Sequence, residues 1–169
     1  METDWVSIGL EVNGVPHRLK VKTSALLVEV LRDELGLKGT KRGCDQGQCG
    51  ACTILLDGKP VLSCILLAAQ ADGKKILTIE GLGPEGKLHP LQEAFIVEGA
   101  AQCGFCTPGM ILSAKALLDQ NPIPADEEIR QAISGNLCRC TGYAKIIRAI
   151  RKAAKQEKGR SNPEHQRGE

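Results

Sequence analysis

The eight cysteines of the chain constrain its fold more than any other feature of the sequence. Half of them form the pattern C-x4-C-x2-C, with a fourth cysteine after eleven further residues. They are Cys44, Cys49, Cys52 and Cys64. This spacing is typical of plant-type [2Fe–2S] sites, in which two tetrahedral irons each take two thiolates. We therefore expect one tight loop to provide three ligands and a strand behind it to provide the fourth.

The loop that carries the first three cysteines is rich in glycine, at Gly43, Gly47 and Gly50. Glycine lets the backbone approach a cluster closely and adopt unusual dihedral angles, so that N–H groups can point at sulfur. Lys41 and Arg42, just upstream, are placed to offset the negative charge of a cluster. Zinc sites usually pair two short knuckles, a pattern that this loop lacks. The first group of cysteines therefore predicts a [2Fe–2S] centre.

The other four cysteines form two short motifs, C-x2-C and C-x-C, separated by 31 residues. They are Cys103, Cys106, Cys138 and Cys140. Considered alone, this set is as compatible with a four-cysteine zinc site as with an iron–sulfur centre. The redox motif next to it, and a cysteine count that divides into two complete sets, favour a second [2Fe–2S] centre. Clustered cysteines bind metals more often than they form disulfides in a reducing cytoplasm.

The N-terminal half has the pattern of a small mixed domain. Apolar and polar residues alternate over 6–12, and Asn13-Gly14 is a strong signal for a hairpin turn into a return strand. Ser24 is a candidate cap for a helix that Gly36 ends. Further strands are expected at 53–56, 61–64 and 75–80. Residues 1–82 are therefore predicted to form a β-grasp, ferredoxin-like domain.

The pattern changes at the glycine-rich segment 81–86, which we interpret as a domain boundary. Beyond it the sequence predicts helices and no strand, with Pro90 and Pro108 in first turns and Asp126 as a cap. The helices are expected at 90–98, 108–119, 126–134 and 144–155. Four short helices favour an all-α four-helix bundle over 83–155, which makes the whole chain α+β. The polar residues 156–169 are expected to form a disordered tail.

Composition excludes several classes of function. The formal charge of +2 is too small to indicate a nucleic-acid partner, and the aromatic residues are too few to stack on bases. No apolar run is long enough for a membrane-spanning helix, and the first residues lack the apolar stretch of a signal peptide. We therefore expect a cytoplasmic protein. The sequence offers no Ser/His/Asp set or Cys/His pair for acid–base or nucleophilic catalysis.

Basic residues recur at helical spacing near the C-terminus, and they allow two interpretations. They are Lys145, Arg148, Lys152 and Lys155. A solvated helix face is the simpler one, and docking on an acidic surface of a partner is the alternative. For the whole chain, the cysteine pattern alone also leaves open a free-standing ferredoxin-like carrier or a zinc-stapled interaction protein with one iron–sulfur site.

Three motifs, in this order, resemble the molybdenum hydroxylase family that includes xanthine dehydrogenase, aldehyde oxidoreductase and CO dehydrogenase. The motifs are CDQGQCGACT at 44–53, QCGFCTPG at 102–109 and GNLCRCTGY at 135–143. The resemblance extends over nearly the whole chain, from about Val6 to Lys155. It implies a small iron–sulfur subunit with a ferredoxin-like domain and a four-helix-bundle domain, each holding one [2Fe–2S] cluster.

The resemblance also implies the roles of particular residues and partners. Cys44, Cys49, Cys52 and Cys64 would bind the outer cluster, and the second cysteine set the inner one. Gln102 and Cys140 match positions that contact the pterin of the molybdenum cofactor. Molybdopterin and FAD would reside on two partner subunits of a hetero-oligomer, between which this subunit relays electrons without catalysis of its own. A xanthine or aldehyde dehydrogenase type is expected, with CO dehydrogenase and hydroxybenzoyl-CoA reductase types as alternatives.

Overall fold

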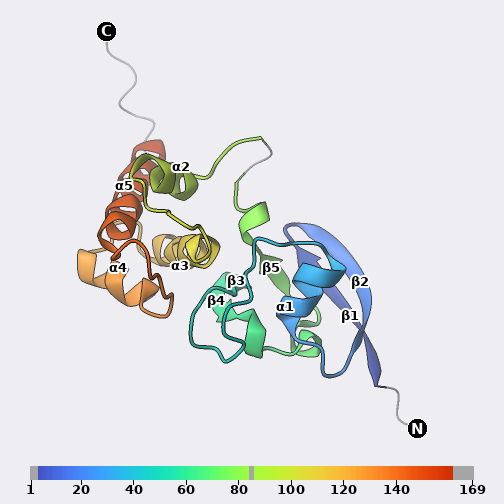
Figure 1. The fold of residues 1–169 in the computed structure, drawn as a ribbon. Coiled ribbons are helices and arrows are strands. Elements are labelled where there is room, and N and C mark those ends of the chain that lie inside the picture. The colour runs from blue at the N-terminus through green and yellow to red at the C-terminus, as the bar shows by residue number, and fades with distance from the viewer. Residues whose placement is uncertain (1–3, 84–85, 162–169) are drawn as a thin grey trace.

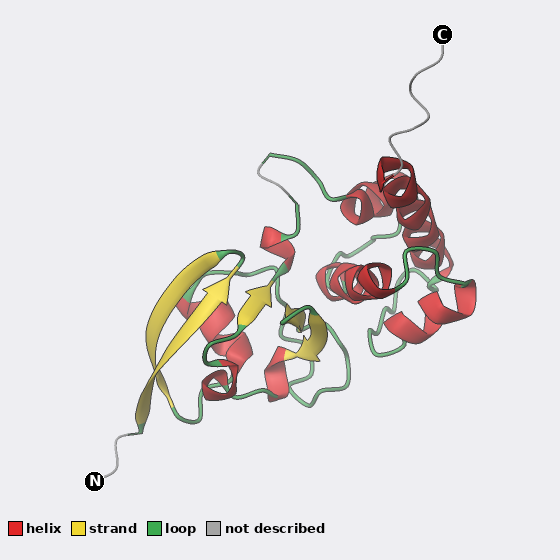
Figure 2. Ribbon diagram, turned by 180° about the vertical axis from the view of Figure 1, so that it is seen from behind, coloured by secondary structure: helices red, strands yellow, loops and turns green. Residues whose placement is uncertain are grey.

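The computed structural model describes residues 4–83 and 86–161. Its N-terminal part is a mixed sheet with a short helix, and its C-terminal part consists of helices (Figure 1). The two parts lie side by side in both views (Figures 1 and 2). This is the α+β architecture that the sequence predicts.

The sheet contains five strands in the order β2-β1-β5-β3-β4. Strands β1 (Trp5–Val12) and β2 (Val15–Lys22) form an antiparallel hairpin around Asn13-Gly14, whose φ angles are 53° and 81°. Strand β5 (Lys75–Leu77) pairs parallel to β1 and antiparallel to β3 (Thr53–Leu56). Strand β4 (Lys59–Leu62) completes the sheet beside β3.

A short helix packs on the sheet and closes the first core. It begins as α1 (Leu27–Glu29) and continues as a π-helical turn, Val30–Glu34. The expected cap at Ser24 is wrong, because Leu26 is the N-cap and its N–H donates to the Glu29 carboxylate at 3.0 Å. Gly36, with φ 71°, ends the segment as predicted. The helix and sheet bury mainly aliphatic side chains, among them Ile8, Leu10, Leu27, Leu31, Ile54 and Ile76.

Two strand predictions need correction. Strand β4 is Lys59–Leu62 rather than 61–64, so Cys64 lies in a 3₁₀ turn, Ser63–Ile65, and not in a strand. Strand β5 ends at Leu77 rather than at residue 80, because the Thr78 N–H donates to the Asn13 side chain instead of to a neighbouring strand. Both changes follow from long-range contacts that a local pattern does not contain.

The helices are α2 (Pro90–Val97), α3 (Thr107–Gln120), α4 (Asp126–Ile133) and α5 (Ala144–Ser161). Asp126 is the first residue of α4 rather than its cap, which is Ala125. Helix α5 continues to Ser161, so the expected tail is helical from residue 156 to 161; residues 162–169 lie outside the described residues. The bundle core includes Leu91, Met110, Leu112, Ile129, Ile146 and Ile150.

The two parts share one buried interface. Leu55 of β3 is 2% exposed and belongs to the core of the helical part, against which Leu77 and Ile79 also pack. Helix α3 lies along β3 and β4 (Figure 2). The helices are therefore held against the sheet by apolar side chains as well as by the chain connection.

Two of the basic residues at helical spacing on α5 form ion pairs within the chain. Lys152 Nζ lies 3.0 Å from Glu98 Oε1, and Arg148 Nε lies 4.0 Å from Glu98 Oε2. Glu98 directly follows α2, so these ion pairs connect α2 to α5. Partly exposed pairs of this kind contribute little stability.

In the described ranges, each helix is either too short or too polar to cross a lipid bilayer.

We expect Ile150→Ala to destabilise the helical part by about 2–5 kcal/mol, because it leaves a cavity in a fully buried site. The matched control is Ile96→Ala on α2, where the side chain is 68% exposed and the effect should stay within about 0.5 kcal/mol. Chemical unfolding followed by circular dichroism measures both. Equal losses in the two variants would contradict the core described here.

Candidate metal centres

The first cysteine loop is shaped so that backbone N–H groups point at sulfur. Asp45, Gly47 and Gly50 all have positive φ, at 55°, 71° and 72°. The loop bends around the Cys44 sulfur, which accepts hydrogen bonds from the N–H groups of residues 46, 48 and 49, at 3.5, 3.4 and 3.4 Å. These donors lower the pKa of the Cys44 thiol to about 6. Cys44 is therefore a thiolate near neutral pH and a ready metal ligand.

Behind the loop, Cys52 and Cys64 are buried. Burial raises the pKa of the Cys52 thiol to about 11, although the Cys64 N–H donates to its sulfur. The two thiols contact each other. A thiolate at such a position needs a cation beside it, since burial disfavours the charged form and metal binding releases the proton.

The second cysteine set lies at the start of α3 and in the loop between α4 and α5. Cys103 Sγ and Cys140 Sγ are 3.6 Å apart and exposed, and Cys106 contacts Cys138. Burial raises the pKa of the Cys106 thiol to about 12. Burial also opposes ionisation of Cys138, but hydrogen bonds led by the one with the Thr141 hydroxyl, at 3.1 Å, outweigh it and lower its pKa.

The predicted ligands are thus brought together as contacting pairs. The pairs are Cys44 with Cys49, Cys52 with Cys64, Cys103 with Cys140, and Cys106 with Cys138. Within the described ranges, no group of three or more Cys, His, Asp or Glu side chains is gathered tightly enough for one metal ion. Two pairs of thiols in each set form the donor set that a centre with two irons requires. The residues fit a [2Fe–2S] cluster at each site.

The two sites touch each other. The Leu137 N–H donates to the Cys49 carbonyl at 2.9 Å, so a residue next to Cys138 of the second set is bonded to Cys49 of the first set. Phe105, between Cys103 and Cys106, lies against Gly43 of the first loop: a Cβ at Gly43 would come within 3.3 Å of its ring. The first loop and the second set therefore form one continuous region.

The sequence did not indicate that Asn136 and Tyr143 organise this region. Asn136 is 3% exposed, and its side chain bonds to both parts of the fold. The Tyr143 hydroxyl accepts from the Cys138 N–H at 2.7 Å and donates to the Asn136 carbonyl at 3.0 Å, which fixes the second-set loop. Both residues fall inside the motif at 135–143, but the spacing of the motif does not reveal what they contact.

Two further predictions concern residues at the edges of the sites. Gln102 Nε2 donates to the Cys140 carbonyl at 3.1 Å, and both residues are exposed. Arg42 is balanced within the loop, because it pairs with Asp45 at 2.8 Å and with Glu29 at 3.2 Å. Lys41 Nζ donates to the Lys38 carbonyl at 2.8 Å. Carboxylates of the loop and of α1 therefore compensate the positive charge of Arg42.

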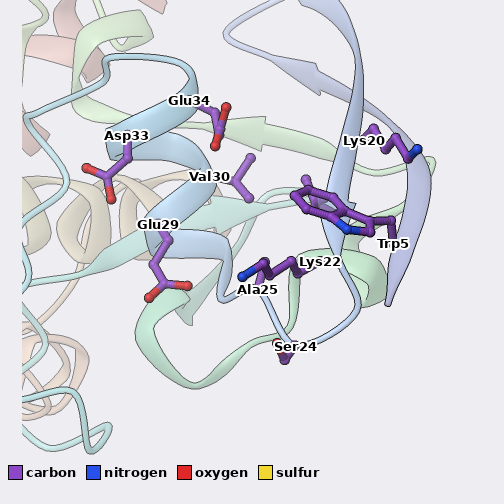
Figure 3. Close-up of a pocket in the computed structure, with 10 residues that line it drawn as sticks. Trp5, Lys20, Lys22, Ser24, Ala25, Glu29, Val30, Asp33 and Glu34 are labelled. Atoms are coloured by element: carbon purple, nitrogen blue, oxygen red, sulfur yellow. The ribbon is translucent and has the colours of Figure 1, made fainter. Parts of the chain in front are cut away.

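A separate hollow of about 250 Å³ lies between the β1–β2 hairpin and the helical segment formed by α1 and the π-helical turn (Figure 3). Trp5 lies on one side, with Lys22 Nζ 5.9 Å from its ring centre, and Glu29, Asp33 and Glu34 lie on the other (Figure 3). Its described lining residues include no cysteine. The hollow mixes both signs of charge and takes no part in the cysteine sites.

Comparisons with known proteins agree with this geometry. Residues 10–78 match the family of 2Fe-2S iron-sulfur cluster binding domains, and residues 78–151 match the [2Fe-2S] binding domain family. The chain is 51% identical over 151 residues to the nicotinate dehydrogenase small FeS subunit of Eubacterium barkeri, which covers 89% of this chain and 96% of that one.

Two further comparisons extend the match to a solved structure and to a larger protein. The fold superposes on a chain of quinoline 2-oxidoreductase from Pseudomonas putida 86 with a TM-score of 0.89, at 48% identity and with 95% and 99% of the two chains covered. Aldehyde oxidoreductase of Megalodesulfovibrio gigas is 51% identical over 86% of this chain, which corresponds to 16% of that longer protein. The chain belongs to the family of small iron–sulfur subunits of the molybdenum hydroxylases.

Proposed function

We propose that the eight thiols bind two [2Fe–2S] clusters, with one contacting pair on each iron. Cys44 and Cys49 would hold one iron of the first cluster, and Cys52 and Cys64 the other. Cys103 with Cys140, and Cys106 with Cys138, would hold the two irons of the second. The single observation that carries this assignment is that each cysteine set is divided into two contacting pairs.

The subunit relays electrons between the molybdopterin site of one partner subunit and FAD, or another acceptor, on a second. When bound, the two clusters supply one-electron carriers. The chain itself provides thiolates, backbone N–H donors to sulfur and burial, which together set how readily each centre accepts charge. The contact between Cys49 and Leu137 keeps the two centres adjacent.

The second centre faces the molybdopterin subunit in this proposal. Cys103 and Cys140 are exposed, and the Gln102 side chain lies on the Cys140 backbone. This exposed edge is open to a partner, and Gln102 and Cys140 are the residues that resemblance assigns to the pterin contact. The first centre then lies on the side toward the flavin.

The substrate is chosen on the partner subunit. The relatives reported above are named for nicotinate, an aldehyde and quinoline, although their iron–sulfur parts are about half identical to this chain. We propose an enzyme of the xanthine or aldehyde dehydrogenase type. The alternatives are a CO dehydrogenase or hydroxybenzoyl-CoA reductase type complex, in which the molybdopterin subunit acts on a different substrate, and a free-standing carrier without a molybdopterin or FAD partner.

We propose a domain division at residues 82 and 83, supported by the two family matches, which meet at residue 78. We also propose a cytoplasmic complex, because clustered cysteines that bind metal are typical of a reducing compartment. In an oxidising compartment, cysteines of small domains are usually paired as disulfides.

Metal analysis of the anaerobically purified chain should give about four irons and about four acid-labile sulfides per chain, with negligible zinc. A result near two irons and one zinc would instead support a zinc site at the second cysteine set.

Cys49→Ser should change the electron paramagnetic resonance (EPR) spectrum of the first cluster and leave the second signal largely intact. Cys138→Ser should do the reverse and destabilise the helical part, because a metal centre joins its two loops. Each variant serves as the control for the other. Equal loss of both signals in both variants would contradict separate centres.

Affinity purification of the tagged chain from its native host should co-purify a molybdopterin-containing subunit and an FAD-containing subunit. Mass spectrometry, with cofactor analysis of the eluate, identifies them. A chain that elutes alone, with both clusters and no pterin, would support the free-standing carrier instead.

A further inference from the structure

Asn136 connects the helical part to the first cysteine loop through a fully bonded side chain. Its Oδ1 accepts from Ser113 Oγ of α3 at 2.7 Å. Its Nδ2 donates to the Gly50 carbonyl at 2.9 Å and to Thr53 Oγ1 at 3.2 Å. The side chain is buried, so neither group can exchange these partners for bulk water.

The Gly50 carbonyl belongs to the peptide group that also carries the Ala51 N–H. In a planar trans peptide these two groups point in opposite directions. Cys49 Sγ and Ala51 lie beside each other on the far side of the peptide, since a Cβ at Gly43 would lie 2.9 Å from Cys49 Sγ and 3.5 Å from Ala51 Cβ. The Ala51 N–H is a donor to that sulfur. Whatever fixes the Gly50 carbonyl therefore also aims a hydrogen-bond donor at a predicted cluster ligand.

The neighbouring peptide is held from the same side. The Leu137 N–H donates to the Cys49 carbonyl at 2.9 Å, so residues 136 and 137 fasten two consecutive peptide groups of the first loop. The approach is close: a Cβ at Gly50 would lie 2.2 Å from the Gly135 carbonyl. Thr53, the first residue of β3, also donates to the Gly50 carbonyl, but it belongs to the sheet part, whereas Asn136 connects the loop to the helical part.

We propose that Asn136 is a positioning residue for the first centre. Its amide, supplied by the helical part, holds the Gly50–Ala51 peptide so that the Ala51 N–H points at the Cys49 sulfur. This inference rests on the proposed function, since it requires a cluster on Cys49. An N–H donor to a ligand sulfur stabilises the reduced, more negative cluster, so the residue raises the reduction potential of a centre in the neighbouring domain.

The test is Asn136→Ala in the full chain purified with its partner subunits. The readouts are the EPR spectrum and the reduction potential of each cluster, assigned with the Cys49→Ser and Cys138→Ser variants. We expect the first cluster to change its spectrum and to shift to a more negative potential, by more than the second cluster shifts. Wild-type values for the first cluster would overturn the proposal.

A matched control separates positioning from general loss of stability. Thr78 is also fully buried, and its hydroxyl bonds to Asn13 at 2.9 Å and to Glu80 at 2.6 Å, outside the cysteine loop. Thr78→Val should lower the melting temperature without moving either cluster potential. If Thr78→Val shifts the first cluster as Asn136→Ala does, the effect is general and the proposal fails.

Asn136→Ser provides a second variant if the alanine variant does not fold. Serine keeps a polar group near Ser113 but is too short to reach the Gly50 carbonyl, so the same negative shift is expected. The two proposals fail separately: a wild-type complex with no iron–sulfur signal removes the proposed function. If the wild type gives both signals and a folded Asn136→Ser variant gives the same spectrum and potential for the first cluster, only the role of Asn136 is contradicted.

Discussion

Two hydrogen bonds hold the two cysteine loops together: Asn136 donates to the Gly50 carbonyl, and Leu137 donates to the Cys49 carbonyl. They connect a loop of the sheet part to a loop of the helical part, and each loop carries predicted cluster ligands. The contact leaves no room for side chains, since a Cβ at Gly109 would lie 2.4 Å from the Gly50 carbonyl. These backbone contacts therefore help to fix the relation between the two sites.

The cysteine sites explain how a core with few aromatic side chains is stabilised. Outside the sites the buried side chains are mostly aliphatic and contribute less area each than aromatic rings would. Burial raises the pKa values of Cys52 and Cys106, so the thiolates of these two residues depend on a bound cation. Metal binding and folding are then linked, because the ligands are paired by the fold and the metal stabilises the pairing.

Local sequence patterns predicted the parts of the fold that depend on neighbouring residues. The hairpin at Asn13-Gly14, strand β3 and the start of α2 at Pro90 all follow from turn chemistry or alternation, and the structure agrees. The cysteine spacing likewise identified all eight thiols that the fold brings into pairs. Cys64 was expected in a strand and lies in a 3₁₀ turn, since the chain turns at Ser63, which bonds to the Cys52 carbonyl.

What could not be predicted depends on contacts between distant residues. Asn136 and Gly50 are 86 positions apart, and no local spacing relates them. Tyr143 has a positive φ of 66° and a hydroxyl that reaches back to Cys138, neither of which a helix pattern contains. The N-cap at Leu26 is different, because it uses the Glu29 carboxylate only three residues along the chain, a local contact that the expected cap at Ser24 overlooked.

Spin quantitation of the dithionite-reduced, anaerobically reconstituted chain tests the central claim most directly. Two [2Fe–2S] centres on paired thiolates should give two distinguishable EPR signals that integrate to about one unpaired spin each. A single signal of about one spin per chain, or a colourless sample without a signal, would contradict the account.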